Sequence, residues 1–90
     1  MDIGYVWDEH KYDRVQEKHD VRFVEVVDVF EDARALHGPD PGGNPNRRMV
    51  VGKTPGGRVL QVIYTDEDAP LARIITAFEA SQEWRDEYFN

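Results

Sequence analysis

The chain has 90 residues, a formal net charge of −7 and no cysteine. This length suits one small domain with a single core, so we expect one domain over residues 1–90. The absence of cysteine excludes disulfides and thiolate metal sites, and the acidic charge disfavours non-specific binding to nucleic acid or anionic membranes. No apolar run approaches the ~18 residues of a membrane span. The first residues also lack the basic and apolar regions of an export signal, so we expect a cytoplasmic protein.

The first part of the chain predicts a short strand and a polar helix. Residues 3–7 are mostly aromatic and β-branched, which suits the pleated surface of a strand. Asp8 follows as the expected N-cap of a helix over residues 9–19. Lys18 and His19 close that helix, where cations complement the helix dipole, and this role alone would account for the pair.

A second helix is predicted over residues 22–31, because Asp20 interrupts the first helix and an apolar stripe then recurs at helical spacing. The stripe consists of Phe23, Val26, Val27 and Phe30. The acidic residues fall largely on the opposite face and are Glu25, Asp28, Glu31 and Asp32. Such a face is usually solvated, although it could also receive a basic partner.

Residues 33–37 suit a further strand, and residues 38–45 form a loop by their glycine, proline and asparagine content. The loop differs from a phosphate-binding loop, because no Gly-Lys-Ser/Thr follows it and no strand leads directly into a helix. We therefore expect no nucleotide site there.

Three runs rich in β-branched and aromatic residues predict an antiparallel meander over residues 47–52, 57–65 and 71–78. The connections are residues 53–57, whose glycines permit positive φ, and residues 66–70, which end in a proline. The middle run has almost no polar alternation. We therefore place it at the centre of the sheet with both faces covered.

Residues 79–88 predict a closing helix that turns Ala80, Trp84 and Tyr88 toward the sheet. The expected element order is β-α-α-β-β-β-β-α, with two helices ahead of a mainly antiparallel sheet. This order belongs to the α+β class.

The charge is distributed unevenly along the chain. Residues 1–45 hold eleven acids and five bases, whereas residues 46–90 hold seven acids and six bases. Between residues 47 and 58 there are four bases and no acid: Arg47, Arg48, Lys53 and Arg58. This strip could bind phosphate, or it could merely solvate the edge of a sheet, where lysine opposes aggregation.

At this point the residues and their order resemble a known family, the BrnT toxins of the RelE-like superfamily. The likeness covers about residues 5–88. Its first half rests on Trp7-Asp8, Lys11, Lys18-His19, Val21, Phe23, Glu25, Val29-Phe30, Asp32, Arg47 and Gly52. Its second half rests on Gly57-Arg58-Val59-Leu60, Val62, Tyr64-Thr65, Arg73-Ile74-Ile75-Thr76-Ala77, Ala80 and Arg85.

The resemblance implies a RelE-like fold and a toxin of a type II toxin–antitoxin system. Such a toxin cleaves RNA and is held in check by a cognate antitoxin protein, whose other half typically binds operator DNA. It implies no membrane partner and no cofactor. The spacing of the three histidines does not suggest zinc, and no carboxylate pair is locally arranged for magnesium, so we expect no metal site.

RNA cleavage without a metal needs a base for the ribose 2′-OH, cations for the phosphate oxygens and an acid for the leaving 5′-oxygen. We assign His19 as that acid or base, since imidazole suits proton transfer near neutral pH. The other candidate catalytic residues are Lys18, Arg58 and Arg73. The candidate phosphate-binding residues are Arg47, Arg48 and Lys53. We expect these cations to meet on one patch of surface.

Each assignment has a structural alternative. Arg73 would otherwise be a sheet-surface residue paired with an acid, and Arg58 would keep the flank of a hairpin soluble. His10 and His37 are expected to be ordinary surface histidines. A catalytically inactive binding module that still pairs with an antitoxin is the alternative function, because Phe78 stands where the family tends to carry an arginine.

Overall fold

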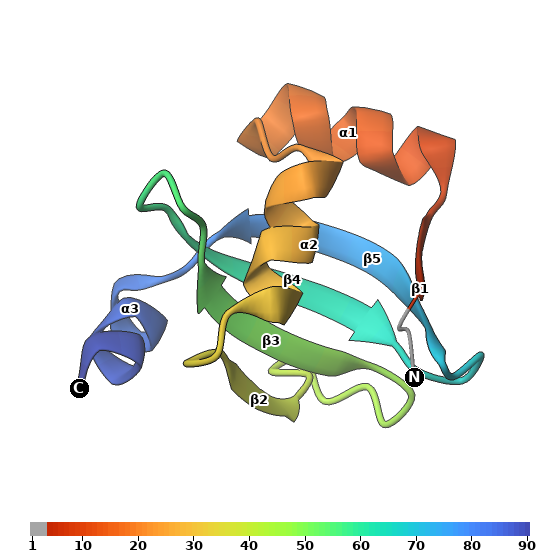
Figure 1. Ribbon diagram of the computed structural model, residues 1–90. Helices are drawn as coiled ribbons and strands as arrows, with labels where there is room; N and C mark the ends of the chain where they lie inside the picture. The colour runs from red at the N-terminus through yellow and green to blue at the C-terminus, as the bar shows by residue number, and fades with distance from the viewer. Residues whose placement is uncertain (1–3) are drawn as a thin grey trace.

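A five-stranded β-sheet forms the middle layer of the molecule in the computed structural model, which describes residues 4–90 (Figure 1). The elements in chain order are β1 (Gly4–Trp7), α1 (Glu9–His19), α2 (Phe23–Glu31), β2 (Leu36–Pro39), β3 (Arg48–Lys53), β4 (Val59–Thr65), β5 (Leu71–Glu79) and α3 (Gln82–Phe89). The predicted order and the α+β class are confirmed. Ile3, which the sequence placed in the first strand, lies outside the described residues.

The strands lie in the order β1-β5-β4-β3-β2. The pairs β2–β3, β3–β4 and β4–β5 are antiparallel, as the meander predicted, and only β1 runs parallel to its neighbour β5. Every residue of β4 is buried, because strands flank both its edges and helices cover both its faces. The sequence-based placement of this strand at the centre of the sheet is therefore confirmed.

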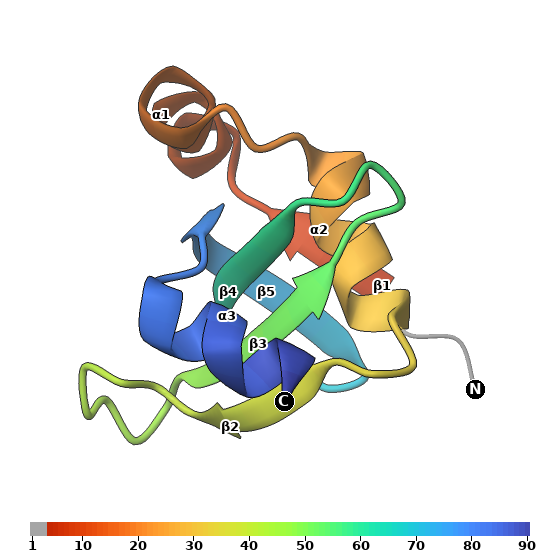
Figure 2. The ribbon, with the colours of Figure 1, turned by 90° about the vertical axis from the view of Figure 1, so that its left-hand side faces the viewer.

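The two faces of the sheet carry separate apolar cores. One core joins the side chains of α1 and α2 to the sheet through Val15, Val26, Val29, Val62 and Ile74. The other lies beneath α3 and holds Met49, Val51, Val59, Ile63 and Ala80. Figure 2 shows α2 and α3 on opposite sides of the sheet. Trp84 and Tyr88 pack against the second core, as expected for the closing helix.

Local capping fixes both ends of α1. The side chain of Asp8 accepts a hydrogen bond from the backbone N–H of Lys11 at 3.1 Å, which confirms the predicted N-cap. At the other end Asp20 adopts the left-handed conformation, with φ 51°, and its N–H donates to the carbonyl of Gln16. The chain therefore turns sharply after His19 and enters α2 at Phe23 after a short connection.

Several bounds differ from the sequence-based expectation. The closing helix, expected to begin at residue 79, begins at Gln82, because β5 continues through Glu79 as a strand paired with β4. The strand predicted at residues 33–37 begins only at Leu36, because Asp32 first holds a turn by accepting the backbone N–H of Arg34. It continues to Pro39 at the sheet edge, where a missing N–H is tolerated. Along α2, Val29 is fully buried, whereas Val27 of the predicted stripe is only half-buried.

None of the helices within residues 4–90 is both long and apolar enough to cross a membrane.

Gly52 lies close against the backbone of α2, and this contact leads to a prediction about stability. A Cβ at this position would lie 2.9 Å from the carbonyl oxygen of Val29, whereas a Cβ at Gly38 would meet nothing within 4 Å. We expect Gly52→Ala to lower the free energy of unfolding by about 1–3 kcal/mol through overpacking. Gly38→Ala, in the neighbouring strand, should change it by less than about 1 kcal/mol. Urea denaturation of the two variants measures both; equal effects would contradict the close contact.

Candidate functional site

A groove of about 400 Å³ lies between α1 and β5. Its walls carry four basic side chains, one acid, one hydroxyl and two apolar side chains; these are Lys11, Arg14, Lys18, His19, Glu17, Thr76, Val15 and Ile75. Figure 1 shows α1 lying along this side of the sheet. The groove therefore gathers basic residues on a protein whose net charge is −7.

The basic wall follows from the periodicity of α1. Lys11, Arg14 and Lys18 stand at i, i+3 and i+7, so they share one face of the helix. Val15 lies between them in the sequence and is buried in the core, which fixes the rotation of the helix about its axis. Burial of this one valine keeps the basic face turned toward the groove.

The floor of the groove is the part of β5 that β1 does not cover. The pairing of β1 with β5 ends at Ile74, and β5 continues to Glu79. Among residues 4–90, no strand pairs with this side of β5 beyond Ile74. Ile75 and Thr76 consequently offer an apolar surface and a hydroxyl group at the base of the groove.

The groove cations have no carboxylate partners among the described residues. Within residues 4–90 the ion pairs involve Arg22, Arg48, Arg58 and Arg73, and none of them involves Lys11, Arg14 or Lys18. All three side chains are exposed. Their charge is therefore available to an anion in the groove.

His19 is the last residue of α1 and presents its imidazole at one end of this row. Its ring contacts that of Phe78 in β5, with ring centroids 5.8 Å apart and planes tilted by 49°. Its backbone carbonyl accepts a hydrogen bond from Nη2 of Arg58 at 3.3 Å. The imidazole thus has one side against an aromatic ring, while the residue as a whole stays exposed.

Arg58 ties four segments of the chain together. Its Nη1 donates to the carboxylate of Glu25 at 3.0 Å and to the carbonyl of Asp20 at 2.8 Å. Its Nε donates to Glu79 at 3.3 Å. Two carboxylates thus neutralise this guanidinium. Arg58 immediately precedes β4, and its contacts join that strand to the end of α1, to α2 and to β5. Placing Glu25 on the solvated acidic face was wrong: the residue is 9% exposed and pairs with Arg58.

The arginines expected to join Arg58 lie at the other end of the sheet. Arg73 pairs in register with Thr65 and Arg48 with Tyr64, whereas Arg58 immediately precedes Val59. At ~3.3 Å per residue, about 20 Å separate the two ends of β4. The expected single patch is therefore not formed. Lys18, His19 and Arg58 come together, and the other arginines stay apart from them.

Ion pairs occupy two of these distant arginines. Arg73 binds Asp68 at 3.0 Å, which agrees with the structural alternative considered for it, and Arg48 lies 3.8 Å from Asp66. Arg47 precedes β3 and is exposed. The sequence-based prediction failed here because register, which a one-dimensional charge count ignores, sets where each cation lies.

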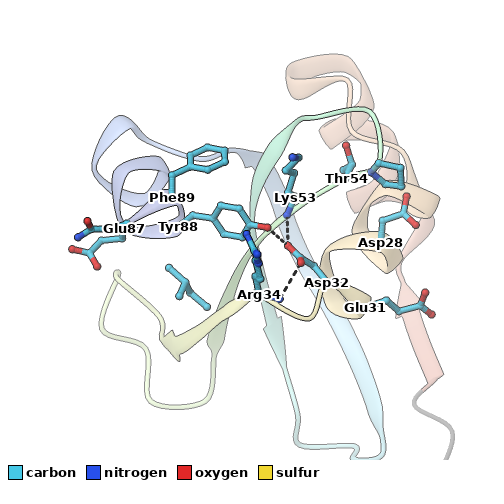
Figure 3. A pocket seen from close by; sticks show the side chains of 12 residues that line it. Asp28, Glu31, Asp32, Arg34, Lys53, Thr54, Glu87, Tyr88 and Phe89 are labelled. Atoms are coloured by element: carbon cyan, nitrogen blue, oxygen red, sulfur yellow. Dashed lines mark hydrogen bonds between the residues drawn. The ribbon is translucent and has the colours of Figure 1, made fainter.

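Lys53 lies in a second, larger cavity of about 880 Å³ (Figure 3). Four carboxylate residues and two cations line it: Asp28, Glu31, Asp32, Glu87, Arg34 and Lys53. Asp32 accepts hydrogen bonds from the hydroxyl of Tyr88 and from the backbone N–H of Lys53 (Figure 3). The excess of carboxylates makes this cavity unsuited to a phosphate, although it is the larger of the two.

The contact between Asp32 and Tyr88 shifts the pKa of both side chains. Burial and then the hydrogen bond to Asp32 raise the pKa of Tyr88 to about 12. Burial raises the pKa of Asp32, but the hydrogen bonds from Tyr88 and from two backbone N–H groups outweigh it and lower the pKa below its ordinary value. The contact joins α3 to the end of α2 and has a structural role.

Metal ligands do not gather among the described residues. Within residues 4–90 no group of three His, Asp or Glu side chains is arranged to hold a metal ion.

Three residues of the groove, Lys11, Arg14 and Thr76, were not predicted as site residues from the sequence. The signal for the first two was present, because they share helical spacing with Lys18, which was a candidate. Thr76 could not be found in this way, since its position depends on where β1 stops pairing with β5.

The model of a family described as "Ribonuclease toxin, BrnT, of type II toxin-antitoxin system" matches residues 7–83. The crystal structure of the ribonuclease toxin BrnT from Brucella abortus is similar, with a TM-score of 0.71 and 23% sequence identity. The alignment covers 90% of this chain and 100% of that one. No curated protein sequence matches the chain at a significant level.

The hydrogen bonds and ion pairs of Arg58 predict that replacing this arginine lowers the free energy of unfolding far more than replacing Arg73 does. Arg58→Ala leaves the buried Glu25 with only the more distant guanidinium of Arg22, at 3.8 Å, so we expect a loss of about 3 kcal/mol in the free energy of unfolding. Arg73→Ala breaks an exposed pair and should cost less than about 1 kcal/mol. Adding Glu25→Gln to Arg58→Ala should recover part of the loss. Urea denaturation of the variants measures these effects, and equal costs for the two single variants would contradict these contacts of Arg58.

The raised pKa of Tyr88 predicts a dependence of stability on alkaline pH. The folded pKa of about 12 lies above the ordinary value of 10, so this contribution is complete below pH 10 and is lost as the pH rises toward 12. The stability advantage of the natural protein over Tyr88→Phe should therefore be constant from pH 7 to about pH 10 and shrink above it. Urea denaturation across this range measures the difference. A constant difference up to pH 12 would show that Tyr88 does not bind Asp32.

Proposed function

The chain belongs to the family of BrnT ribonuclease toxins of type II toxin–antitoxin systems, and from this premise we propose that it is an endoribonuclease that cleaves RNA in the groove between α1 and β5. The proposal is supported by one groove that combines an imidazole with cations that have no ion-pair partner in the described part of the chain. Cations bind the phosphate, and the imidazole transfers protons. Among the described residues, His19 is the one histidine in the groove.

The proposed reaction is an internal transesterification that needs no metal. The ribose 2′-oxygen forms a bond to the adjacent phosphorus while the bond from phosphorus to the 5′-oxygen breaks. A base removes the proton of the 2′-OH, and an acid gives a proton to the leaving 5′-oxygen. The products are a 2′,3′-cyclic phosphate and a free 5′-hydroxyl.

His19 supplies one of these two proton transfers, as base or as acid. Lys18 is its neighbour in the sequence and has no ion-pair partner within residues 4–90, so it stabilises negative charge on the phosphate. Arg58 acts through structure instead. It binds the carbonyl of His19 and orients the end of α1, while its own charge is neutralised.

The proposed chemistry uses none of the predicted cations outside this end of the groove. Arg73, Arg47 and Arg48 lie at the far end of the sheet. Arg73 forms an ion pair with Asp68, and Arg48 forms one with Asp66. Lys53 lies in the acidic cavity beside Asp32. These residues would have to bind RNA far from the reacting phosphate to contribute.

Membership of a type II toxin family implies an antitoxin partner. We propose that this partner is a protein that blocks the groove, that it contacts operator DNA on the toxin's behalf, and that the pair acts in the cytoplasm. The toxin itself has too acidic a balance to bind DNA non-specifically.

A second candidate function is a protein-binding module without efficient cleavage. Phe78, an apolar residue, lies against His19, and Glu79 binds the guanidinium of Arg58. A phosphate near His19 would therefore meet an aromatic ring and a nearby carboxylate as well as Lys18. These two groups weaken the binding of a phosphate at His19, and this is the observation that favours the second function.

Cleavage by the purified protein tests the proposal. The antitoxin-free protein should cleave RNA in the presence of EDTA and leave 2′,3′-cyclic phosphate ends. His19→Ala should lower the cleavage rate by about 10²-fold or more, the usual contribution of acid–base assistance. His37→Ala provides the control, because His37 is exposed in β2 at the opposite edge of the sheet. Gel electrophoresis of labelled RNA measures both rates.

Two outcomes would overturn the assignment. Equal rates for the two histidine variants would remove His19 from the reaction. Absence of cleavage by a folded natural protein, with circular dichroism showing helix and sheet, would establish the second function instead.

A further inference from the structure

The basic wall of the groove extends well beyond the reacting end. Along the axis of α1, at 1.5 Å per residue, Arg14 lies ~6 Å from Lys18 and Lys11 a further ~4.5 Å away. A single reacting phosphate beside His19 needs only the nearest of these cations. The other two are exposed, unpaired within residues 4–90 and turned to the same groove. They are unexplained by the cleavage chemistry.

A nucleic acid strand offers one phosphate for each nucleotide, so cations in a row match a strand that runs along the helix. The opposite wall supports the same interpretation. Ile75 lines the groove, and Phe78 contacts His19 at the end of the row; both side chains are half-buried and also pack against the core beneath α3. A charged row facing apolar and aromatic side chains is the arrangement by which proteins hold single-stranded nucleic acid, with phosphates on one side and base faces on the other.

The dimensions of the groove favour one strand over two. A duplex is a rigid body that is recognised across its wide minor groove, and its bases are not free to turn toward a protein wall. The space between α1 and β5 is about 400 Å³, which admits part of one strand. Attack by the 2′-oxygen in line with the leaving oxygen also requires a flexible backbone, which a single strand provides.

We propose that the groove is a site for single-stranded RNA in which Arg14 and Lys11 bind the phosphates that follow one another away from the scissile phosphate at His19. The inference rests on the proposed function for the position of the cleaved bond. The strand lies along α1, and its polarity is set by which neighbour of the scissile phosphate meets Arg14. Lys11 and Arg14 are substrate-positioning residues and take no part in proton transfer.

Binding measured without cleavage tests this row directly. In a His19→Ala background, the affinity for a labelled single-stranded RNA is measured by fluorescence anisotropy over a range of salt concentrations. Each phosphate contact in a single strand contributes about −0.7 to the slope of log K against log salt. Arg14→Ala and Lys11→Ala should each make the slope less steep by about 0.7, and the double variant by about 1.4. Arg14→Lys should keep the slope.

Arg34→Ala is the matched control. Arg34 is likewise exposed and without an ion pair among residues 4–90, but it lines the acidic cavity. Its removal should leave the slope unchanged. If Arg34→Ala and Arg14→Ala alter the slope equally, the slope depends only on net charge, and the proposed phosphate contacts of Arg14 and Lys11 are wrong. If a blunt duplex of the same sequence binds as tightly as the single strand, the choice of substrate is wrong.

Cleavage kinetics separate this inference from the proposed function. In the protein that retains His19, Lys11→Ala combined with Arg14→Ala should raise KM by about tenfold or more and change kcat little, because these residues hold substrate and transition state equally. A loss of kcat with unchanged KM would overturn their positioning role. Absence of cleavage in the natural protein would contradict the proposed function, while the salt slopes would still decide whether the row binds RNA.

Discussion

The hydrogen bonds of Arg58 hold together the elements on which the groove depends. One guanidinium binds the carbonyls at the end of α1, the carboxylate of Glu25 in α2 and the carboxylate of Glu79 in β5. Because Glu25 is buried, removing its partner would leave a charge shielded from solvent, which costs far more than breaking an exposed pair. The guanidinium fixes the end of α1 above β5, and that position places His19 against Phe78. The same contacts neutralise the charge of Arg58, so this arginine has a structural role and the unpaired cations that line the groove are those of α1.

Pairing, more than charge count, separates the functional cations from the structural ones. The protein is acidic overall, and four of its eight arginines pair with carboxylates among the described residues: Arg22, Arg48, Arg58 and Arg73. Among residues 4–90 the cations of α1 have no ion-pair partner, because the helix turns them toward the exposed edge of β5, away from the acidic residues of α2. An anion that enters the groove therefore meets uncompensated charge at short range, even though the long-range field repels it. The groove therefore attracts an anionic substrate only at short range, and long-range electrostatic steering does not speed its association.

Periodicity and turn chemistry predicted most of the fold. The limits of α1 were correct because Asp8 and Asp20 punctuate the sequence, and β4 was placed at the centre because its run of apolar residues has no polar alternation. The site was predicted only in part. Lys18 and His19 lie in the groove, but the expected meeting of Arg58 with Arg73 failed, since antiparallel register puts them at opposite ends of the sheet. The burial of Glu25 was also missed, because its partner is 33 residues away in the sequence. Contacts of this range depend on how elements pack, which no local pattern records.

The central claim is that RNA occupies the groove between α1 and β5 and that no other surface binds it. Backbone amide chemical shifts of the His19→Ala protein, recorded by NMR during titration with a single-stranded RNA, test this most directly. The account predicts that the largest changes fall on residues 11–19 of α1 and residues 75–78 of β5, with little change near Arg48 and Arg73. Changes centred on the far end of the sheet, or on the acidic cavity around Asp32, would contradict it.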